Sequence, residues 1–204
     1  MPRWWSAPPN WRLTGAYLAL ASNGAGCHTA RGGKRYPGRR PIPTPFGTVF
    51  AGNLTPDRET GLGNWSAEAF WRPMQHGQSR EGRLLVSAFP YDGYTQISRA
   101  DSDAPFAFLG SLPAVSQANR PHSLRWPHNT QFALATWRTL YFEPQAFAPD
   151  ATQSAEWNRG AYLVRGLGHC AACRSARDAL GGPAGDLVGG RLPQPAWLAP
   201  SLRD

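Results

Sequence analysis

The chain of 204 residues lacks long apolar runs, and its longest uninterrupted ones are about six residues, such as 16–21. A helix that crosses a bilayer needs roughly 20 apolar residues, so we expect no membrane-spanning segment. Cysteine is scarce, and the three cysteines are an odd number that cannot all pair within the chain. Methionine is limited to Met1 and Met74, and Lys34 is the only lysine. Complete disulfide pairing is therefore excluded, and the positive charge comes almost entirely from arginine.

Glycine and proline are abundant, with 22 and 20 residues, which is typical of a chain with many turns and short elements. Lys and Arg outnumber Asp and Glu by 21 to 13, which gives a net charge of +8. The densest basic segment, here named the basic loop, is 31–40, and its cations are Arg31, Lys34, Arg35, Arg39 and Arg40. No helix-turn-helix, zinc-finger or RNP-like spacing accompanies it, so we expect no nucleic-acid partner. We interpret the basic loop as a solvated segment or a docking site for an acidic partner.

An internal repeat organises the chain. Gly-Ala-Tyr-Leu at 15–18 recurs at 160–163, and a cysteine cluster follows each copy, at 24–28 and at 170–174. The repeat predicts three parts, which are a first domain at 13–116, a connector at 117–156 and the incomplete start of a second domain at 157–204.

Four segments carry helix signals, which are 13–22, 66–76, 98–112 and 131–141. Ser66 and Ser98 open the second and third segments and are suited to cap them, and Asn129 or Thr130 is suited to cap the fourth. Pro73 and Pro105 lie inside two of these segments and are expected to kink or shorten them. We find no alternating strand pattern between the segments, so the predicted fold is all-α and rich in loops.

The two cysteine clusters are complementary fragments of one motif. Overlaid, they spell C-x-x-C-H, the attachment motif of a c-type haem. Its two thiols form thioethers to the haem vinyl groups, and its histidine is the proximal iron ligand. The first cluster keeps Cys27 and His28 but has Gly24 in place of the first cysteine. We therefore expect iron ligation by His28 and a single thioether through Cys27.

The second cluster keeps Cys170 and Cys173 but has Arg174 where the proximal histidine belongs. Arginine stays protonated in proteins and does not ligate haem iron. A second haem at Cys170 and Cys173 would be tethered but proximally unligated. Taken alone, C-x-x-C also occurs in disulfides and zinc half-sites. A zinc site would have to combine both clusters, with the ligands Cys27, His28, Cys170 and Cys173.

Further stretches strengthen a family resemblance. They include Pro-Ile-Pro-Thr-Pro-Phe-Gly-Thr at 41–48, Asn-Leu-Thr-Pro-Asp at 53–57, Thr-Gly-Leu-Gly-Asn-Trp-Ser at 60–66, Ala-Phe-Pro-Tyr at 88–91 and Glu-Trp-Asn-Arg-Gly-Ala-Tyr-Leu at 156–163. With these stretches, the chain resembles the membrane-associated, multi-haem cytochrome c subunits of bacterial alcohol, aldehyde and gluconate dehydrogenases. The resemblance covers nearly the whole chain from about residue 13.

The resemblance implies all-α cytochrome c domains, usually three, each with a covalent haem c. It implies an electron-transfer subunit, not a catalyst, that passes electrons from a periplasmic dehydrogenase subunit to ubiquinone in the respiratory chain. It also implies a periplasmic location with peripheral association at the inner membrane. The family's distal methionine falls at Phe89, which cannot ligate iron, and His76 is a conceivable substitute. Measured against the family, the chain reads as a truncated copy with degenerate haem motifs.

The N-terminal segment has two interpretations. Arg3 and Arg12, followed by the apolar stretch 13–21, resemble a signal peptide with an A-x-A cleavage site. Proline and tryptophan crowd the residues before it, and the same stretch carries the first copy of the repeat. We interpret it as the first cytochrome helix, so the chain shows no convincing signal peptide.

An alternative function stands beside electron transfer. The damaged motifs are also consistent with a haem-less, cytochrome-derived chain that acts only as a scaffold or binding module. No Ser/His/Asp set or carboxylate pair indicates intrinsic catalysis, so neither function is that of an enzyme.

Overall fold

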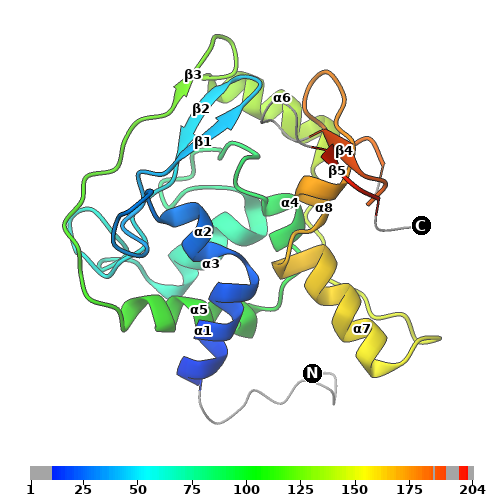
Figure 1. Cartoon of the computed structure of the whole chain (residues 1–204), viewed down its shortest axis with the longest axis horizontal. Coiled ribbons are helices and arrows are strands. Elements are labelled where there is room, and N and C mark those ends of the chain that lie inside the picture. Colours follow the sequence, from blue (N-terminus) through cyan, green and yellow to red (C-terminus); the bar gives the residue numbers. More distant parts are fainter. Residues whose placement is uncertain (1–10, 186, 192–197, 202–204) are drawn as a thin grey trace.

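The computed structural model describes residues 11–201 except 186 and 192–197 (Figure 1). Short helices and two small antiparallel sheets alternate along the chain. The helices are α1 (Trp11–Ala21), α2 (Gly24–His28), α3 (Ala67–His76), α4 (Tyr91–Tyr94), α5 (Arg99–Gly110), α6 (Gln131–Tyr141), α7 (Ala155–Tyr162), the π-helical turn η1 (Leu163–Leu167) and α8 (Ala171–Arg174). The strands are β1 (Pro41–Thr44), β2 (Gly47–Phe50), β3 (Ser123–Leu124), β4 (Gly190–Arg191) and β5 (Leu198–Ala199).

The four predicted helices are confirmed as α1, α3, α5 and α6, within two residues at each end. Side-chain caps define the starts of three of them: Ser66, Ser98 and Thr130 each accept a hydrogen bond from the backbone N–H three residues ahead. Neither Pro73 nor Pro105 shortens its helix. A proline removes one intrahelical hydrogen bond, and packing of the surrounding turns offsets that loss.

The expectation of an all-α fold is wrong in one respect, because the chain also forms antiparallel sheets. In the first sheet β2 lies between β1 and β3, with Pro41 opposite Phe50 and Gly47 opposite Leu124. Strand β1 has a partner on one side only, which is where a strand tolerates prolines such as Pro41 and Pro43. The second sheet pairs β4 with β5.

Helices α1 and α5 cross in close contact in the lower part of Figure 1. Gly15 makes this crossing: a Cβ atom at this position would lie 2.1 Å from the carbonyl oxygen of Ala104. In the first copy of the repeat, glycine is required at this position because two helix backbones meet there. Its counterpart Gly160 on α7 would meet nothing within 4 Å.

Two clusters of buried residues form the core. One contains Leu18, Met74 and Tyr94 from the predicted first domain together with Tyr162 and Leu167 from the second. The other contains Tyr36, Leu62 and Leu109, with Ala25 packed against it. The core cluster that contains Leu18 and Tyr162 thus packs residues from both cysteine-bearing segments against one another.

A buried polar contact adds to this packing between α5 and α7. The hydroxyl of Tyr162 donates to Asp101 and accepts from the backbone N–H of Ser98. Arg159 lies 3.9 Å from the same carboxylate. Burial raises the pKa of Asp101, and the Tyr162 hydroxyl and Arg159 act against that rise.

Helix α6 is only partly covered by the rest of the protein. None of its residues is buried, and Phe132 is 82% exposed. No helix among the described residues is both long enough and apolar enough to span a bilayer, which agrees with the sequence.

Candidate functional site

Helix α2 carries the first cluster and begins directly after α1. Asn23 adopts a left-handed conformation (φ +53°) and its carbonyl accepts a hydrogen bond from the N–H of Cys27, at 3.1 Å. This reversal places Cys27 and His28 on a short turn beside the core. His28 forms the last residue of that turn and is partly exposed.

The side chain of His28 has a defined orientation. Its Nδ1 atom lies 2.7 Å from the carbonyl oxygen of Gly52. A carbonyl only accepts hydrogen bonds, so Nδ1 carries the proton and Nε2 carries the lone pair. No described residue forms a hydrogen bond with Nε2. Burial lowers the pKa of His28, against a smaller opposing effect of the Gly52 hydrogen bond, so the ring is neutral at neutral pH.

This arrangement meets the chemical requirements of a metal-ligating histidine. Such a ligand is a neutral imidazole whose second nitrogen donates to a carbonyl or carboxylate. The hydrogen bond from His28 to Gly52 supplies that second contact. His28 therefore fits the role of a proximal haem ligand.

Cys27 lies beside His28 as a free, half-buried thiol. Burial raises its pKa, while the positive charge of Arg40 opposes the rise and Cys173 adds to it. The basic loop borders the first motif through the hydrogen bond that joins the Gly38 N–H to the His28 carbonyl.

The segment after His28 is fixed by backbone hydrogen bonds. The N–H of Gly38 donates to the His28 carbonyl at 2.8 Å, and the N–H of Tyr36 donates to the Thr29 hydroxyl at 3.2 Å. A Cβ atom at Gly38, where φ is +81°, would lie 2.4 Å from the Gly52 carbonyl oxygen. The basic loop therefore packs closely against Gly52, whose carbonyl accepts the hydrogen bond from His28.

The second motif repeats these hydrogen bonds. The N–H of Gly189 donates to the Arg174 carbonyl at 2.7 Å, and the N–H of Leu187 donates to the Ser175 hydroxyl at 3.1 Å. The Arg174 guanidinium donates to the carbonyl of Pro200 at 3.1 Å. The structure therefore repeats the local architecture of the first motif and supports the sequence repeat in three dimensions.

Arg174 takes the place of the imidazole in this second copy. Its contact with Pro200 corresponds to the contact of His28 with Gly52. A guanidinium has donors only and offers no lone pair to iron. The second motif keeps two free thiols, Cys170 and Cys173, but its residues do not fit an iron-ligating site.

Phe89, where the resemblance leads us to expect the distal ligand, is an aromatic residue. Phe89 packs against Tyr94 with 5.1 Å between ring centroids, and Tyr94 in turn contacts His169 edge-to-face at 5.4 Å. Met74 is buried in the core and accepts a hydrogen bond from Ser102 at 3.5 Å, whereas His76 is exposed. The structure therefore gives Met74 a packing role.

The four candidate site residues are not gathered into one metal centre. Within the described part of the chain, no group of three or more His, Cys, Asp or Glu side chains is placed to hold a metal ion. The zinc site considered from the sequence is thus not formed. Sequence reasoning also missed the Gly52 carbonyl, because a backbone acceptor 24 residues from its histidine leaves no residue-type signal.

Comparison with known proteins identifies relatives that span nearly the whole chain. It is 44% identical to a nicotinate dehydrogenase subunit of Pseudomonas putida over 191 residues, which are 92% of this chain and 16% of that protein. It is 37% identical to the gluconate 2-dehydrogenase cytochrome c subunit of Pantoea cypripedii, with 93% of this chain and 45% of the relative covered. The chain is a homologue of cytochrome c subunits. No protein-family model matches it.

A shorter relative supports the same assignment. This chain is 32% identical to a diheme cytochrome c-type protein of Cereibacter sphaeroides, with 92% of this chain and 66% of that protein covered. Against the two dehydrogenase subunits named above, the chain spans less than half of the relative's length. The aligned region is therefore one part of those larger proteins.

Proposed function

We propose that the chain is an electron-transfer module that carries one haem c at Cys27 and His28. The observation that carries this proposal is the hydrogen bond from His28 to Gly52, because it leaves a neutral imidazole with a free Nε2. Haem bound there would supply reversible one-electron chemistry at its iron. The names of the homologues support the same function.

The residues around His28 would prepare the site for this group. Cys27 provides the one thiol for a covalent tether. Gly24 stands where the motif has its first cysteine, so no second thioether can form there. The Gly52 carbonyl holds the imidazole in one tautomer and orientation. Phe89, where the resemblance leads us to expect the distal methionine, has no atom that could ligate iron.

The second motif would not bind iron in the same way. Cys170 and Cys173 could form thioethers, but Arg174 supplies no axial ligand and its side chain is engaged by Pro200. We therefore assign one haem, not two, to the chain.

A partner with dehydrogenase activity would deliver the electrons. The homologues are named as subunits of nicotinate, gluconate and alcohol dehydrogenases. We propose a non-catalytic role in the periplasm at the inner membrane, between a dehydrogenase subunit and quinone.

The test is covalent haem attachment. The protein is exported in a host with a cytochrome c maturation system, extracted with acid acetone, and analysed by its pyridine haemochrome spectrum. We expect about one extraction-resistant haem per chain, none after Cys27→Ser, and an altered iron-ligand spectrum after His28→Gln. His128→Gln is the matched control, because His128 only stacks on Phe46. A wild-type chain free of haem under these conditions would contradict the proposal and favour the haem-less scaffold.

A further inference from the structure

The net positive charge of the chain is concentrated in its first 56 residues. Residues 1–56 contain seven Lys and Arg and no Asp or Glu, whereas 57–204 contain fourteen and thirteen. Nearly all of the net charge of +8 therefore comes from one short part of the sequence. Five of those seven cations lie on the basic loop, and all five are exposed.

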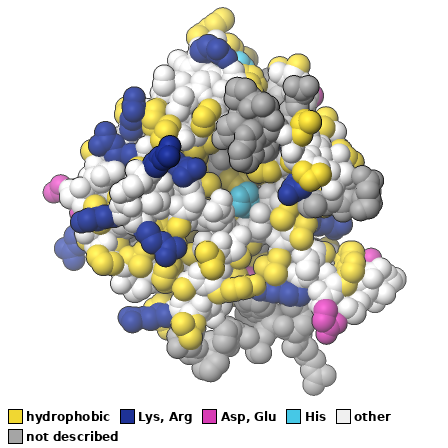
Figure 2. All heavy atoms as spheres, in the orientation of Figure 1, with side chains coloured by type: hydrophobic (Ala, Val, Ile, Leu, Met, Phe, Trp, Pro, Cys, Tyr) yellow, Lys and Arg dark blue, Asp and Glu magenta, His cyan; other side chains and the backbone are white. Residues whose placement is uncertain are grey.

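The surface of the molecule reflects this asymmetry. Figure 2 shows Lys and Arg side chains gathered on the left of the view, with few acidic side chains among them. Within the described residues, none of Arg31, Lys34, Arg39 and Arg40 forms an ion pair with a carboxylate. Their charges are therefore directed to solvent and available to a partner.

The loop presents these charges from a fixed backbone. Tyr36 is buried at its centre, although its φ of +75° is unfavourable for a non-glycine residue. Its carbonyl accepts a hydrogen bond from the N–H of Leu54 at 2.9 Å, and the N–H of Arg39 donates to the Ala51 carbonyl at 2.7 Å. A partner that binds here would lose little affinity to loop ordering.

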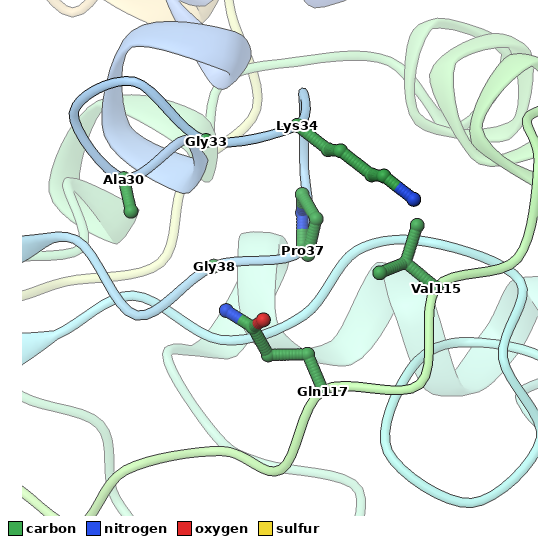
Figure 3. A pocket seen from close by; sticks show the side chains of 7 residues that line it. All are labelled: Ala30, Gly33, Lys34, Pro37, Gly38, Val115 and Gln117. Carbon is green, nitrogen blue, oxygen red and sulfur yellow. The ribbon is translucent and has the colours of Figure 1, made fainter.

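The basic loop also contains a cavity. A hollow of about 310 Å³ opens between the loop and the segment around Val115 and Gln117. Figure 3 shows that the Lys34 side chain lies on one side of it and the Gln117 amide on the other. No acidic side chain lines it, and both polar side chains can donate hydrogen bonds. A single carboxylate would be complementary to this pair, whereas no aromatic side chain is present to stack a base.

The loop borders the candidate haem site. The N–H of Gly38 in the loop donates directly to the His28 carbonyl at 2.8 Å. A protein bound to this surface would lie next to the redox group. That adjacency favours a protein over a membrane or nucleic acid as the occupant.

We propose that the basic loop and its cavity form the docking surface for an acidic redox protein, with a partner carboxylate inserted between Lys34 and Gln117. The electron exchange in this proposal rests on the proposed function, but the binding does not. The binding surface is complete in the protein chain itself.

The experiment measures binding and electron transfer separately. The probe is plastocyanin, a small acidic copper protein, used in its redox-inactive cadmium form for titration calorimetry and in its copper form for stopped-flow oxidation of the reduced cytochrome. The test variant combines Lys34→Glu with Arg39→Glu. The control combines Arg83→Glu with Arg165→Glu, which gives the same net charge on exposed residues outside the basic loop. A cationic cobalt phenanthroline complex serves as an oxidant that needs no acidic docking.

Electrostatic steering by a charged surface raises the association rate of a complementary partner by about ten- to a thousandfold. At low ionic strength we expect the test variant to weaken plastocyanin binding at least tenfold and the control to stay within about twofold of the wild type. Equal weakening in both variants would overturn the proposal, as would tighter, variant-sensitive binding to duplex DNA or anionic vesicles instead. Loss of reaction with both oxidants while binding stays specific would contradict the proposed function and leave the docking surface supported.

Discussion

Position 24 gives the sharpest test of how the first motif works. Gly24→Cys would recreate C-x-x-C-H, with the new thiol three residues before Cys27 on the same side of the turn. An added Cβ atom would lie 3.2 Å from the Ala19 carbonyl oxygen and 3.7 Å from Ser22 Oγ and Tyr36 Cε1. The φ at Gly24 lies outside the left-handed region, so a side chain is tolerated there.

The expected change in stability is small. Replacing a helical glycine typically gains about 0.5–1 kcal/mol because the unfolded chain loses freedom. The 3.2 Å contact requires a shift of a few tenths of an ångström, which offsets part of this gain. We therefore expect the free energy of unfolding to change by less than about 1 kcal/mol, while haem attachment changes from one thioether to two.

Haemochrome spectroscopy measures this change directly. Saturation of the second vinyl group shortens the conjugated system, so the α-band should move to shorter wavelength and trypsin digestion should yield a doubly linked haem peptide. Ala25→Cys is the matched control, because a thiol two residues from Cys27 points to another side of the helix. If Gly24→Cys binds haem but keeps the single-thioether spectrum, α2 does not present position 24 to the haem, and our assignment of the site is wrong.

Three further expectations follow from other contacts. Arg174→His should let an imidazole donate to Pro200 as His28 does to Gly52, and should raise the haem content towards two per chain, whereas Arg177→His should not. Tyr162→Phe should cost about 1–3 kcal/mol in urea unfolding, because it removes a buried hydrogen bond to Asp101; an unchanged midpoint would contradict that role. Because burial raises the pKa of Asp101 above 3.8 in the folded state, the unfolded state ionises first and stability should fall as pH rises from about 4. Unfolding of Asp101→Asn should lack this fall, and parallel pH profiles of the two proteins would refute it.

The helices were predictable because their signals are local. A serine or threonine cap needs only the backbone three residues ahead, and Gly77 ends α3 through its own positive φ. The first sheet was not predictable in the same way. Strand β1 contains two prolines, and its pairing with β2 depends on a tight turn rather than on an alternating pattern.

The candidate site was predictable in its residue types but not in its contacts. The pair Cys27 and His28 stood out because the second cluster supplied the missing part of the motif. The reason why His28 is suited to bind iron lies in the Gly52 carbonyl, which any residue could provide. The role of Arg174 was likewise visible only as a missing ligand, whereas the structure shows what its side chain contacts instead.

Helix α5 contacts the helices that lead into both cysteine motifs. Its backbone at Ala104 meets Gly15 of α1, which leads into Cys27, and one turn earlier Asp101 accepts a hydrogen bond from Tyr162 of α7, which leads into Cys170. The two helices that precede the cysteine clusters, α1 and α7, therefore both contact α5. The two clusters are therefore linked in space through contacts with one helix, although a long connector separates them in sequence.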